Sequence, residues 1–452
     1  MIKMRLATAA AIVNGQLYGP DGEFCGLCGD TRKLQPQVLY FAVKGPHFDG
    51  HDFLTAAHKQ GAAAALVEHV VPTVNIAQIV CSDPVMAIGS LMSHWRKQFN
   101  LPVAAITGSN GKTTVKEMVA SILGQLGPVL VTQGNLNNHI GVPLTLARLG
   151  AEHQGAVIEM GANHENEIAY LSAMVQPTVC LINNAAAAHL EGFGDLHGVA
   201  RGKGEIFQGL DSQGIGIINA DDAFFEYWRG LLKGRRVLSF GLNHPADISA
   251  TWQTQGLSSV IDMNLLGQHL SVNLPLPGEH NVRNALAASA MAVATKVSLA
   301  TIKTGLETLK PVPGRLQSVA GKNGARLIND SYNANPASLK AALTTLSQLP
   351  GIRVAVLGDM YELGENAPQH HRQAGQWAQE LGLDQLYATG TLGQFIAAGF
   401  GPKAHYFETK ELLQVALQNT LNAQMTVLVK GSRGMKMETI VHYLQQTPTT
   451  EK

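Results

Sequence analysis

Short hydrophobic runs alternate with longer stretches in which apolar residues recur at helical spacing over most of the chain. In the middle of the chain, the runs at 103–107, 156–160, 179–182 and 215–218 have the composition of buried strands. Helical patterns lie between them, and such alternation is typical of a parallel sheet with crossover helices. We therefore predict an α/β fold.

The N-terminal part has the same alternation on a smaller scale. Residues 38–43 predict a strand, residues 6–13 a small helix and residues 54–65 an Ala-rich helix. Asp83 followed by Pro84 is a typical helix start, and it predicts a helix that runs to about residue 99. We expect this helix to lead from a small α/β domain into a second domain.

The hydrophobic period changes between residues 247 and 276. Segments 248–252, 260–265 and 270–274 have the pattern of short antiparallel strands, so we predict a small second sheet in the middle domain. Helices are expected over 284–309. The proline-rich break at 311–314 then ends this domain.

A third alternation follows the break. It predicts strands near residue 327 and at 354–357, 385–388 and 427–429, with helices between them, which is a doubly wound, Rossmann-like pattern. A chain of 452 residues has the length of about three ordinary domains. We therefore predict three domains, with limits at 1–82, 83–314 and 315–452.

Composition and charge exclude several classes of protein. Hydrophobic residues make up 45% of the chain and charged residues 15%, so it is not intrinsically disordered. Lys plus Arg and Asp plus Glu both number 33, which leaves no net charge to attract nucleic acid or an anionic membrane. No apolar stretch is long enough to cross a bilayer. We therefore predict a cytoplasmic monomer that binds small molecules, with no nucleic-acid partner and no membrane insertion.

The four cysteines are too few and too scattered for a disulfide framework. Cys25 and Cys28 form a C-x-x-C pair. A zinc site needs a second ligand pair of similar spacing, and a redox motif opens a helix after a strand; neither pattern follows here. We therefore predict two reduced cysteines in a turn.

A loop rich in small residues follows the predicted strand 103–107 and precedes a helical pattern. Backbone N–H groups of such a loop bind phosphates, Lys112 adds a positive charge, and the Thr113 hydroxyl can bind Mg²⁺. The strict P-loop pattern has Gly where Ile106 stands, but strand, loop and helix occur in the required order, which favours nucleotide binding over a chance G-K-T turn. The predicted ATP-binding residues of this loop are Gly108, Ser109, Asn110, Gly111, Lys112, Thr113 and Thr114.

A P-loop alone does not distinguish an NTPase switch, a kinase and a ligase. Further polar segments occur at 134–138, 157–164, 183–193 and 203–207, each after or near a predicted strand. Because the carboxyl ends of parallel strands meet at one edge of a sheet, we expect these segments beside the P-loop.

With these segments, the sequence closely resembles the Mur ligase family, the ATP-dependent enzymes that add amino acids to the peptidoglycan precursor, over essentially the whole chain. Within that family, segments like 159–168 and 189–207 are typical of the member that adds a dipeptide. The resemblance implies an acid–amino-acid ligase that joins D-alanyl-D-alanine to UDP-N-acetylmuramoyl-tripeptide through an acyl phosphate. It also implies three domains that bind the uridine nucleotide, ATP and the dipeptide in chain order.

The resemblance also assigns binding residues outside the P-loop. Those expected to contact ATP are His280, Asn281, Arg315 and Asp330. Those expected to contact the other substrates are Thr31, Arg32, Gly45, Asp49, His51, Asn135, Asn137, Asn138, Asn333 and Asn335.

Four residues are expected to carry catalysis: Lys112, Glu159, His189 and Lys203. The resemblance implies two Mg²⁺ ions, with Thr113, Glu159 and His189 as metal ligands. The spacing 203 − 189 = 14 matches the lysine that the family carbamylates, so we expect a carbamate on Lys203. A carboxylate beside nucleotide phosphates is a usual Mg²⁺ ligand, whereas a His ligand is unusual for this hard cation.

Each of these residues also has a simpler interpretation. Glu159 could be a solvated carboxylate at a strand end, His189 a capping or core histidine, and Lys203 a surface lysine. His280 and Asn281 could cap a helix that begins near residue 282, and Asp330 could cap a loop.

Other functions stay open at this stage. A sibling ligase or folate polyglutamate synthase shares the P-loop but lacks the 189–207 pattern, and a nucleotide-gated scaffold would keep the P-loop without catalysis. The sequence also departs from the family at Gln37 and Asn166, where Gly is usual, and at Gly202, where Ala is common. Position 166 belongs to a turn near the expected tripeptide site.

Overall fold

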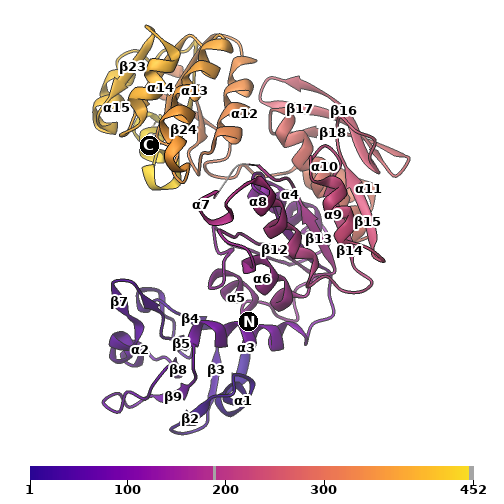
Figure 1. The fold of residues 1–452 in the computed structure, drawn as a ribbon, viewed down its shortest axis with the longest axis vertical. Coiled ribbons are helices and arrows are strands. Elements are labelled where there is room, and N and C mark those ends of the chain that lie inside the picture. The colour runs from indigo at the N-terminus through magenta and orange to yellow at the C-terminus, as the bar shows by residue number, and fades with distance from the viewer. Residues whose placement is uncertain (187–189, 447–452) are drawn as a thin grey trace, which may run out of the picture.

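The computed structural model describes residues 1–186 and 190–446. Figure 1 shows three lobes arranged along an arc, with the N-terminal and C-terminal lobes at opposite ends of the middle lobe. Each lobe contains its own main sheet with helices packed on it. The mixed α/β class predicted from the sequence is confirmed.

The N-terminal lobe contains a five-stranded sheet of order β2-β9-β8-β5-β4, beside the small pairs β1-β3 and β6-β7. The small helix expected at residues 6–13 is confirmed as α1. Cys25 and Cys28 lie on successive short strands, with both thiols free. The elements are β1 (Lys3–Arg5), α1 (Leu6–Ile12), β2 (Gln16–Tyr18), β3 (Glu23–Cys25), β4 (Leu27–Cys28), β5 (Leu39–Phe41), β6 (Lys44–Gly45), β7 (Phe48–Asp49), α2 (Leu54–Lys59), β8 (Ala64–Val67) and β9 (Ala77–Val80).

The helix predicted over 54–65 is wrong in its second half. Helix α2 ends at Lys59, and Gly61 follows with φ of 86°, a conformation that ends a helix. Ala64 and Ala65 then belong to β8, whose four residues are all buried between neighbouring strands. Alanine has the highest intrinsic helix propensity, but such a propensity is worth less than about 1 kcal/mol per residue, and burial in the sheet overrides it here.

The middle lobe contains a nine-stranded sheet of order β11-β12-β10-β13-β14-β15-β16-β17-β18. The first seven strands, β11 to β16 in this order, pair in parallel, and α4 and α10 cover one face of this part. The elements are α3 (Pro84–Arg96), β10 (Val103–Thr107), α4 (Lys112–Leu123), β11 (Val129–Val131), α5 (Gly141–Leu146), β12 (Gly155–Glu159), α6 (Glu167–Val175), β13 (Val179–Ile182), α7 (Leu190–Phe193), α8 (Leu196–Gly204), β14 (Ile215–Asn219), α9 (Phe225–Leu231), β15 (Arg236–Phe240), β16 (Ile248–Gln255), β17 (Ser258–Leu265), β18 (Gln268–Leu274), α10 (Glu279–Ala294) and α11 (Leu299–Glu307).

Two sequence-based predictions for this lobe need correction. The antiparallel strands β16, β17 and β18 exist, but they extend the main sheet instead of forming a second one, because β16 pairs with β15 at Phe240 and Ile248. The helices expected over 284–309 are present as α10 and α11, but the first begins earlier than predicted, at Glu279. Lys296, with φ of 62°, and Ser298, which caps α11, separate the two helices.

The C-terminal lobe is a six-stranded sheet of order β19-β20-β24-β21-β22-β23, in which only β19 is antiparallel. The expected strands are present, and β19 and β23 are additional edge strands that the sequence pattern did not reveal. The elements are β19 (Gln317–Ala320), β20 (Arg326–Asp330), α12 (Pro336–Ser347), β21 (Ile352–Leu357), α13 (Ala367–Glu380), β22 (Gln385–Thr389), α14 (Gly393–Phe400), β23 (Ala404–Phe407), α15 (Lys410–Gln418), β24 (Met425–Lys430) and α16 (Glu438–Leu444).

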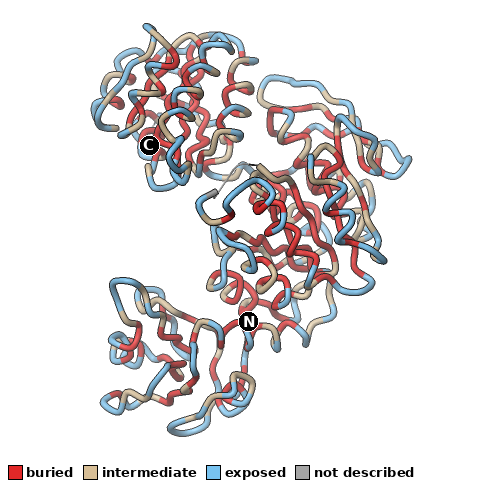
Figure 2. Tube along the Cα trace, viewed as in Figure 1, coloured by how far each residue is buried: buried red, intermediate tan, exposed pale blue. Residues whose placement is uncertain are grey.

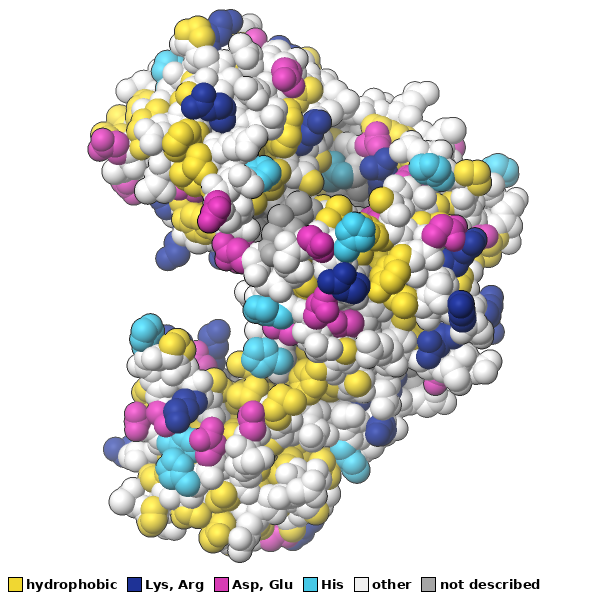
Figure 3. Space-filling model, in the orientation of Figure 1, with side chains coloured by type: hydrophobic (Ala, Val, Ile, Leu, Met, Phe, Trp, Pro, Cys, Tyr) yellow, Lys and Arg dark blue, Asp and Glu magenta, His cyan; other side chains and the backbone are white. Residues whose placement is uncertain are grey.

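Buried residues run along the central strands of all three sheets, and exposed residues follow the outer helices and loops (Figure 2). The predicted domain limits, between residues 82 and 83 and between 314 and 315, lie between the main sheets and stay predictions of domain extent. Figure 3 shows a hollow between the N-terminal and C-terminal lobes, bordered by the middle lobe. None of the helices in the described parts of the chain has the length and apolar character needed to cross a membrane.

Candidate active site

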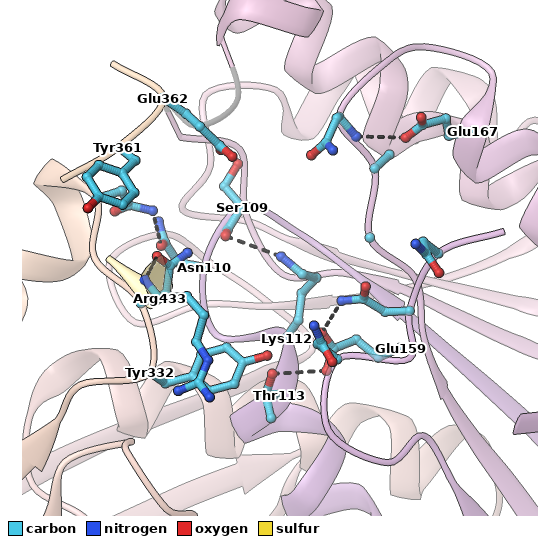
Figure 4. A pocket seen from close by; sticks show the side chains of 18 of the residues that line it. Ser109, Asn110, Lys112, Thr113, Glu159, Glu167, Tyr332, Tyr361, Glu362 and Arg433 are labelled. Atoms are coloured by element: carbon cyan, nitrogen blue, oxygen red, sulfur yellow. Dashed lines mark hydrogen bonds between the residues drawn. The ribbon is translucent and has the colours of Figure 1, made fainter. Parts of the chain in front are cut away.

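Two cavities meet at the junction of the middle and C-terminal lobes. The larger, of about 760 Å³, is lined by the P-loop, the loop at 135–139, the start of α6 and loops of the C-terminal lobe (Figure 4). The smaller, of about 320 Å³, lies toward the start of α10 and the first half of α12. Asn110, Gly111, Arg315 and Ser338 line both cavities, so the two are adjacent parts of one cleft.

The P-loop joins the buried strand β10 to α4. Gly108 and Gly111 have φ of 148° and 80°, which side chains other than glycine rarely adopt. A Cβ on Gly111 would also collide with the amides of Asn183 and Asn284, which pack against the loop. Lys112 folds back so that its Nζ donates to the carbonyl oxygen of Gly108 at 2.6 Å, and burial lowers its pKa. The loop therefore presents backbone donors and one lysine to the cleft.

Glu159 ends strand β12 and is only 2% exposed. Its Oε2 accepts a hydrogen bond from Oγ1 of Thr113 at 3.0 Å, and its Oε1 accepts one from Nδ2 of Asn137 at 2.9 Å (Figure 4). A buried carboxylate beside a hydroxyl is a set of hard oxygen donors of the kind that Mg²⁺ prefers. The alternative interpretation of Glu159, as a solvated carboxylate at a strand end, is thus excluded by its burial.

His189, the third predicted metal ligand, lies outside the described residues. Within residues 1–186 and 190–446, no group of three or more His, Cys, Asp or Glu side chains is placed to hold a metal ion. Thr113 and Glu159 therefore form a partial ligand set, which suits a cation that is also held by nucleotide phosphates.

Arg315 reaches the cleft from the start of the C-terminal lobe. Its Nη2 lies 3.4 Å from Oγ1 of Thr113, and its guanidinium stacks 4.1 Å from the ring centre of Tyr332. Its Nε is buried and has no hydrogen-bond partner among the described residues. A buried donor without a partner is costly, and an anion in the cleft would satisfy it.

The smaller cavity contains the other predicted ATP-contacting residues. Asp330 is buried and accepts from Nζ of Lys430 at 2.6 Å and from the backbone of Leu316 at 3.1 Å. Asn281 donates to the carbonyl of Pro277 at 2.7 Å, which fixes the start of α10. Burial lowers the pKa of His280 to about 4, so its ring is neutral at physiological pH. His280 therefore contributes a neutral ring to the lining of this cavity, which suits contact with a nucleobase better than with a phosphate.

Lys203 lies on α8 and is 2% exposed, so it is not a surface lysine. Its Nζ lies 5.3 Å from the ring centre of Phe193 and has no hydrogen-bond partner among the described residues. Burial, followed by the charge of Lys112, lowers the pKa of Lys203 to about 7. A substantial fraction of this amine is therefore unprotonated near neutral pH, which is unusual for lysine.

The three departures from the family pattern have structural explanations. Gln37 and Asn166 both have positive φ, 67° and 71°, which is the conformation for which glycine is otherwise used. The backbone N–H of Asn166 donates to Glu205 at 2.6 Å, so the turn before α6 is also held by a buried carboxylate. At Gly202 a Cβ would lie 2.5 Å from Phe193, whose ring occupies that space.

The five residues predicted to hold the uridine end lie in the N-terminal lobe and line neither cavity. Arg32 is exposed and paired with Asp30 at 2.8 Å, and Gly45 belongs to the β6-β7 hairpin. His51 is buried: its Nδ1 lies 2.6 Å from Asp49, and its Nε2 accepts from the backbone of Glu68. Both nitrogens of His51 are thus engaged within the protein.

The asparagines predicted from the family pattern divide into two groups. Asn135, Asn137 and Asn138 line the larger cavity on the side of the middle lobe. Asn333 and Asn335 line it from the C-terminal lobe, where the side chain of Asn335 contacts Asn110 of the P-loop at 2.7 Å. The segment 183–193 is expected beside the P-loop, but the sequence analysis assigns no role to Asn183 and Asn184, which hydrogen-bond the backbone of Asn110, or to Asn284, which hydrogen-bonds Asn183. In the sequence, the role of these asparagines is indicated only by their positions, since Asn183 and Asn184 follow a predicted strand and Asn284 lies near the start of a helix.

Comparisons with known proteins agree with this geometry. The family model described as the Mur ligase middle domain matches residues 106–292, and the model described as Mur ligase, glutamate ligase domain, matches residues 314–433. The chain is 42% identical to the UDP-N-acetylmuramoyl-tripeptide–D-alanyl-D-alanine ligase of Escherichia coli (strain K12), with 99% of this chain and 100% of that protein covered. It is 34% identical to the protein of the same name from Bacillus subtilis (strain 168), with 99% and 100% covered.

Solved structures give the same result. A crystal structure of MurF from Acinetobacter baumannii matches with a TM-score of 0.91 at 38% identity, covering 96% of this chain and 97% of that one. MurF ligase from Thermotoga maritima, solved in complex with ADP, matches with a TM-score of 0.82 at 26% identity, covering 93% and 96%. A folylpolyglutamate synthase from Mycobacterium tuberculosis shares the fold at 17% identity, with a TM-score of 0.65 over 80% of this chain.

Proposed function

The chain belongs to the Mur ligase family, and we propose that it joins D-alanyl-D-alanine to UDP-N-acetylmuramoyl-tripeptide with ATP as the energy source. The observation that carries the proposal is the convergence of Lys112, Glu159 and Arg315 from two lobes on one cleft, next to a pocket suited to a nucleoside. Full-length identity to ligases of this name supports the choice of substrates.

The chemistry follows from the substrates and the charges in the cleft. A carboxylate is a poor acyl donor at neutral pH, so its oxygen attacks the γ-phosphorus of ATP, and the P–O bond to ADP breaks. The resulting acyl phosphate has a good leaving group, and the free amine of the dipeptide displaces phosphate to form the amide. Lys112 and the unpartnered Nε of Arg315 offer positive charge to the phosphoryl group in transfer.

Thr113 and Glu159 are the described residues that would hold Mg²⁺, with His189 as a further predicted ligand. Bound Mg²⁺ supplies Lewis-acid stabilisation of the negative charge on the phosphates. Asn137 would orient the Glu159 carboxylate through its hydrogen bond to Oε1. The proposal includes two Mg²⁺ ions, as the family resemblance implies.

Lys203 is proposed to carry a carbamate. The unprotonated Nζ adds to the carbon of CO₂ and loses a proton, which converts a potential cation into an anion. Burial of an amine without an anionic hydrogen-bond partner supports this, since the neutral amine is the reactive form. An anion beside Lys112 would also offset that lysine's charge, whereas two buried cations would repel each other.

We propose that each of the three lobes binds a different substrate. The N-terminal lobe would hold the uridine nucleotide around Thr31, Arg32, Gly45, Asp49 and His51, and the middle lobe ATP. The C-terminal lobe would hold the dipeptide near Asn333 and Asn335, and its docking would exclude water that hydrolyses the acyl phosphate. A cytoplasmic location and a monomeric state are part of the same proposal.

The test is ADP release from ATP on mixing the UDP-tripeptide and D-alanyl-D-alanine, compared with each single omission. We expect ADP release and pentapeptide formation only with all three substrates. A sibling ligase or a folylpolyglutamate synthase would turn over with another acceptor, and a nucleotide-gated scaffold would release ADP without dependence on any acceptor. Either result would contradict the proposal.

A further inference from the structure

Helix α12 of the C-terminal lobe lies along the smaller cavity. Ala337 and Ala341 from its first half line that cavity, together with the start of α10. Near its other end, Thr345 packs so closely on α10 that a Cβ built on Gly278 would lie 2.7 Å from its Oγ1. Helix α12 therefore borders the predicted nucleotide pocket with its first half and contacts the N-cap of α10 near its other end.

The N-cap of α12 contacts the P-loop directly. Oδ1 of Asn335 accepts from the backbone N–H of Ser338 at 2.9 Å, which caps the helix, and Oγ of Ser338 accepts from the backbone N–H of Asn335 at 3.1 Å. Nδ2 of Asn335 donates to Oδ1 of Asn110 at 2.7 Å. The side chain of Asn335 thus caps α12 and also bridges two lobes, because Asn110 lies 225 residues away from it in the sequence.

The cap determines which way both amides face. A backbone N–H can only donate, so Asn335 must direct its oxygen to Ser338 and its NH₂ group to Asn110. Asn110 must then direct its oxygen to Asn335. Its own Nδ2 is left without a partner among the described residues, in a side chain that lines both cavities.

The backbone of Asn110 cannot compensate by moving. Its N–H donates to Oδ1 of Asn184 at 2.9 Å, and its carbonyl accepts from Asn183 at 2.9 Å and from Asn184 at 3.1 Å. Rotation of the side-chain amide is therefore the main freedom left at this position. The direction of that amide depends on the C-terminal lobe and not on the P-loop itself.

We infer that Asn335 is a positioning residue that, when the C-terminal lobe docks, turns the NH₂ group of Asn110 toward the phosphates of the bound nucleotide. This inference rests on the proposed function, because it requires a nucleoside triphosphate in the cleft. The P-loop then has its full set of donors only when the acceptor-binding lobe is in place. Phosphoryl transfer is thereby coupled to the presence of the acceptor side of the active site.

Two variants separate this role from helix capping, since Asp and Ser are both good N-caps. In Asn335→Asp the second carboxylate oxygen faces Asn110, whose amide must flip to donate to it and then directs its oxygen at the phosphates. In Asn335→Ser the side chain is too short to reach Asn110. Thr409→Ser, at the N-cap of α15, is the matched control for a cap exchange away from both cavities.

The measurements are the affinities for a non-hydrolysable ATP analogue and for adenosine, with turnover. We expect Asn335→Asp to bind the analogue roughly tenfold or more weakly, as loss of a hydrogen bond to a charged group implies, while adenosine affinity and thermal stability stay unchanged. Asn335→Ser should lose affinity for the analogue and show weaker docking of the C-terminal lobe by small-angle scattering. The control should match the wild type.

Wild-type affinity for the analogue and wild-type turnover in Asn335→Asp would overturn the inference. Equal losses for the analogue and for adenosine would also overturn it, because they would indicate general disruption of α12. Failure of the proposed function is distinguishable, since it would show in the wild-type enzyme as ADP release that does not depend on the acceptor.

Discussion

Nη2 of Arg315 lies 3.4 Å from Oγ1 of Thr113, so the first residue of the predicted C-terminal domain reaches the second residue of the P-loop helix. The guanidinium stacks on Tyr332, and its Nε is buried without a partner among the described residues. The phosphate-facing part of the cleft therefore contains a cation from each of two lobes. Neither lobe alone has the complete arrangement.

Replacement of Arg315 by Lys should lower turnover by roughly tenfold or more, because an ammonium group can neither stack on Tyr332 nor direct several fixed donors at once. The measurement is kcat for ADP release with all substrates at saturation. Arg372→Lys, an exposed position on α13, serves as the control and should not change kcat. An active Arg315→Lys enzyme would contradict the role of the guanidinium.

Replacement of Lys112 by Ala should reduce turnover by orders of magnitude while the fold stays intact. The fold should survive because Nζ of Lys112 contacts only carbonyl oxygens of its own loop, those of Gly108 and Ser109. Activity and far-UV circular dichroism check both statements, with exposed Lys97→Ala as the control. A Lys112→Ala enzyme that ligates at the wild-type rate would show that this P-loop does not act on phosphate.

The acceptor should be a dipeptide. A site built to pair both the amine and the distant carboxylate of D-alanyl-D-alanine leaves buried polar groups unpaired when free D-alanine binds. We expect ligation of the single amino acid to be slower by orders of magnitude, measured as kcat/KM with each acceptor. Comparable values for D-alanine and the dipeptide would indicate a sibling ligase.

Lys203→Ala should lose activity and regain part of it when formate or acetate is added, because a small carboxylate can replace the carbamate. Lys203→Arg should stay inactive, since guanidinium cannot form a carbamate and keeps its charge. The measurement is turnover with and without the added carboxylates. Rescue by amines alone, or an active Arg variant, would favour a plain cation at this position.

The carbamate should also depend on pH in a defined direction. Burial lowers the pKa of Lys203 to about 7, so the reactive neutral amine becomes more abundant between pH 6 and pH 8, whereas an ordinary lysine stays almost fully protonated. ¹³C NMR with labelled bicarbonate should therefore detect more carbamate on the resting enzyme at pH 8 than at pH 6. The signal should be absent from Lys203→Ala at both pH values.

Replacement of Lys430 by Met should destabilise the C-terminal lobe. Lys430 and Asp330 form a buried pair at 2.6 Å, and removal of the cation leaves a buried carboxylate without its charge partner, at a cost of about 3–5 kcal/mol. Thermal unfolding without nucleotide is the measurement. The double variant with Asp330→Asn should regain much of the loss, and equal melting temperatures for wild type and Lys430→Met would contradict this account.

The sequence by itself determined the features that depend on local pattern. The strands at 103–107 and 179–182 match β10 and β13 residue for residue, because buried parallel strands are continuous apolar runs. The P-loop could be predicted since its glycines, lysine and helix start are contiguous. The family resemblance could be stated in the same way, because it rests on short contiguous motifs, and the comparisons over the whole chain confirm it.

Tertiary structure decided what depends on burial and on contacts distant in sequence. Ala64 and Ala65 form a strand because the sheet buries them, and β16 joins the main sheet through one pairing with β15 that no periodicity encodes. The burial of Lys203 arises only when α8 packs within the middle lobe, and the contact between Asn335 and Asn110 arises only when two lobes meet. A lysine amine and an asparagine amide have the same covalent structure wherever they occur in a chain. Their neighbours in the fold set the pKa of the amine and the direction in which the N–H groups of the amide point.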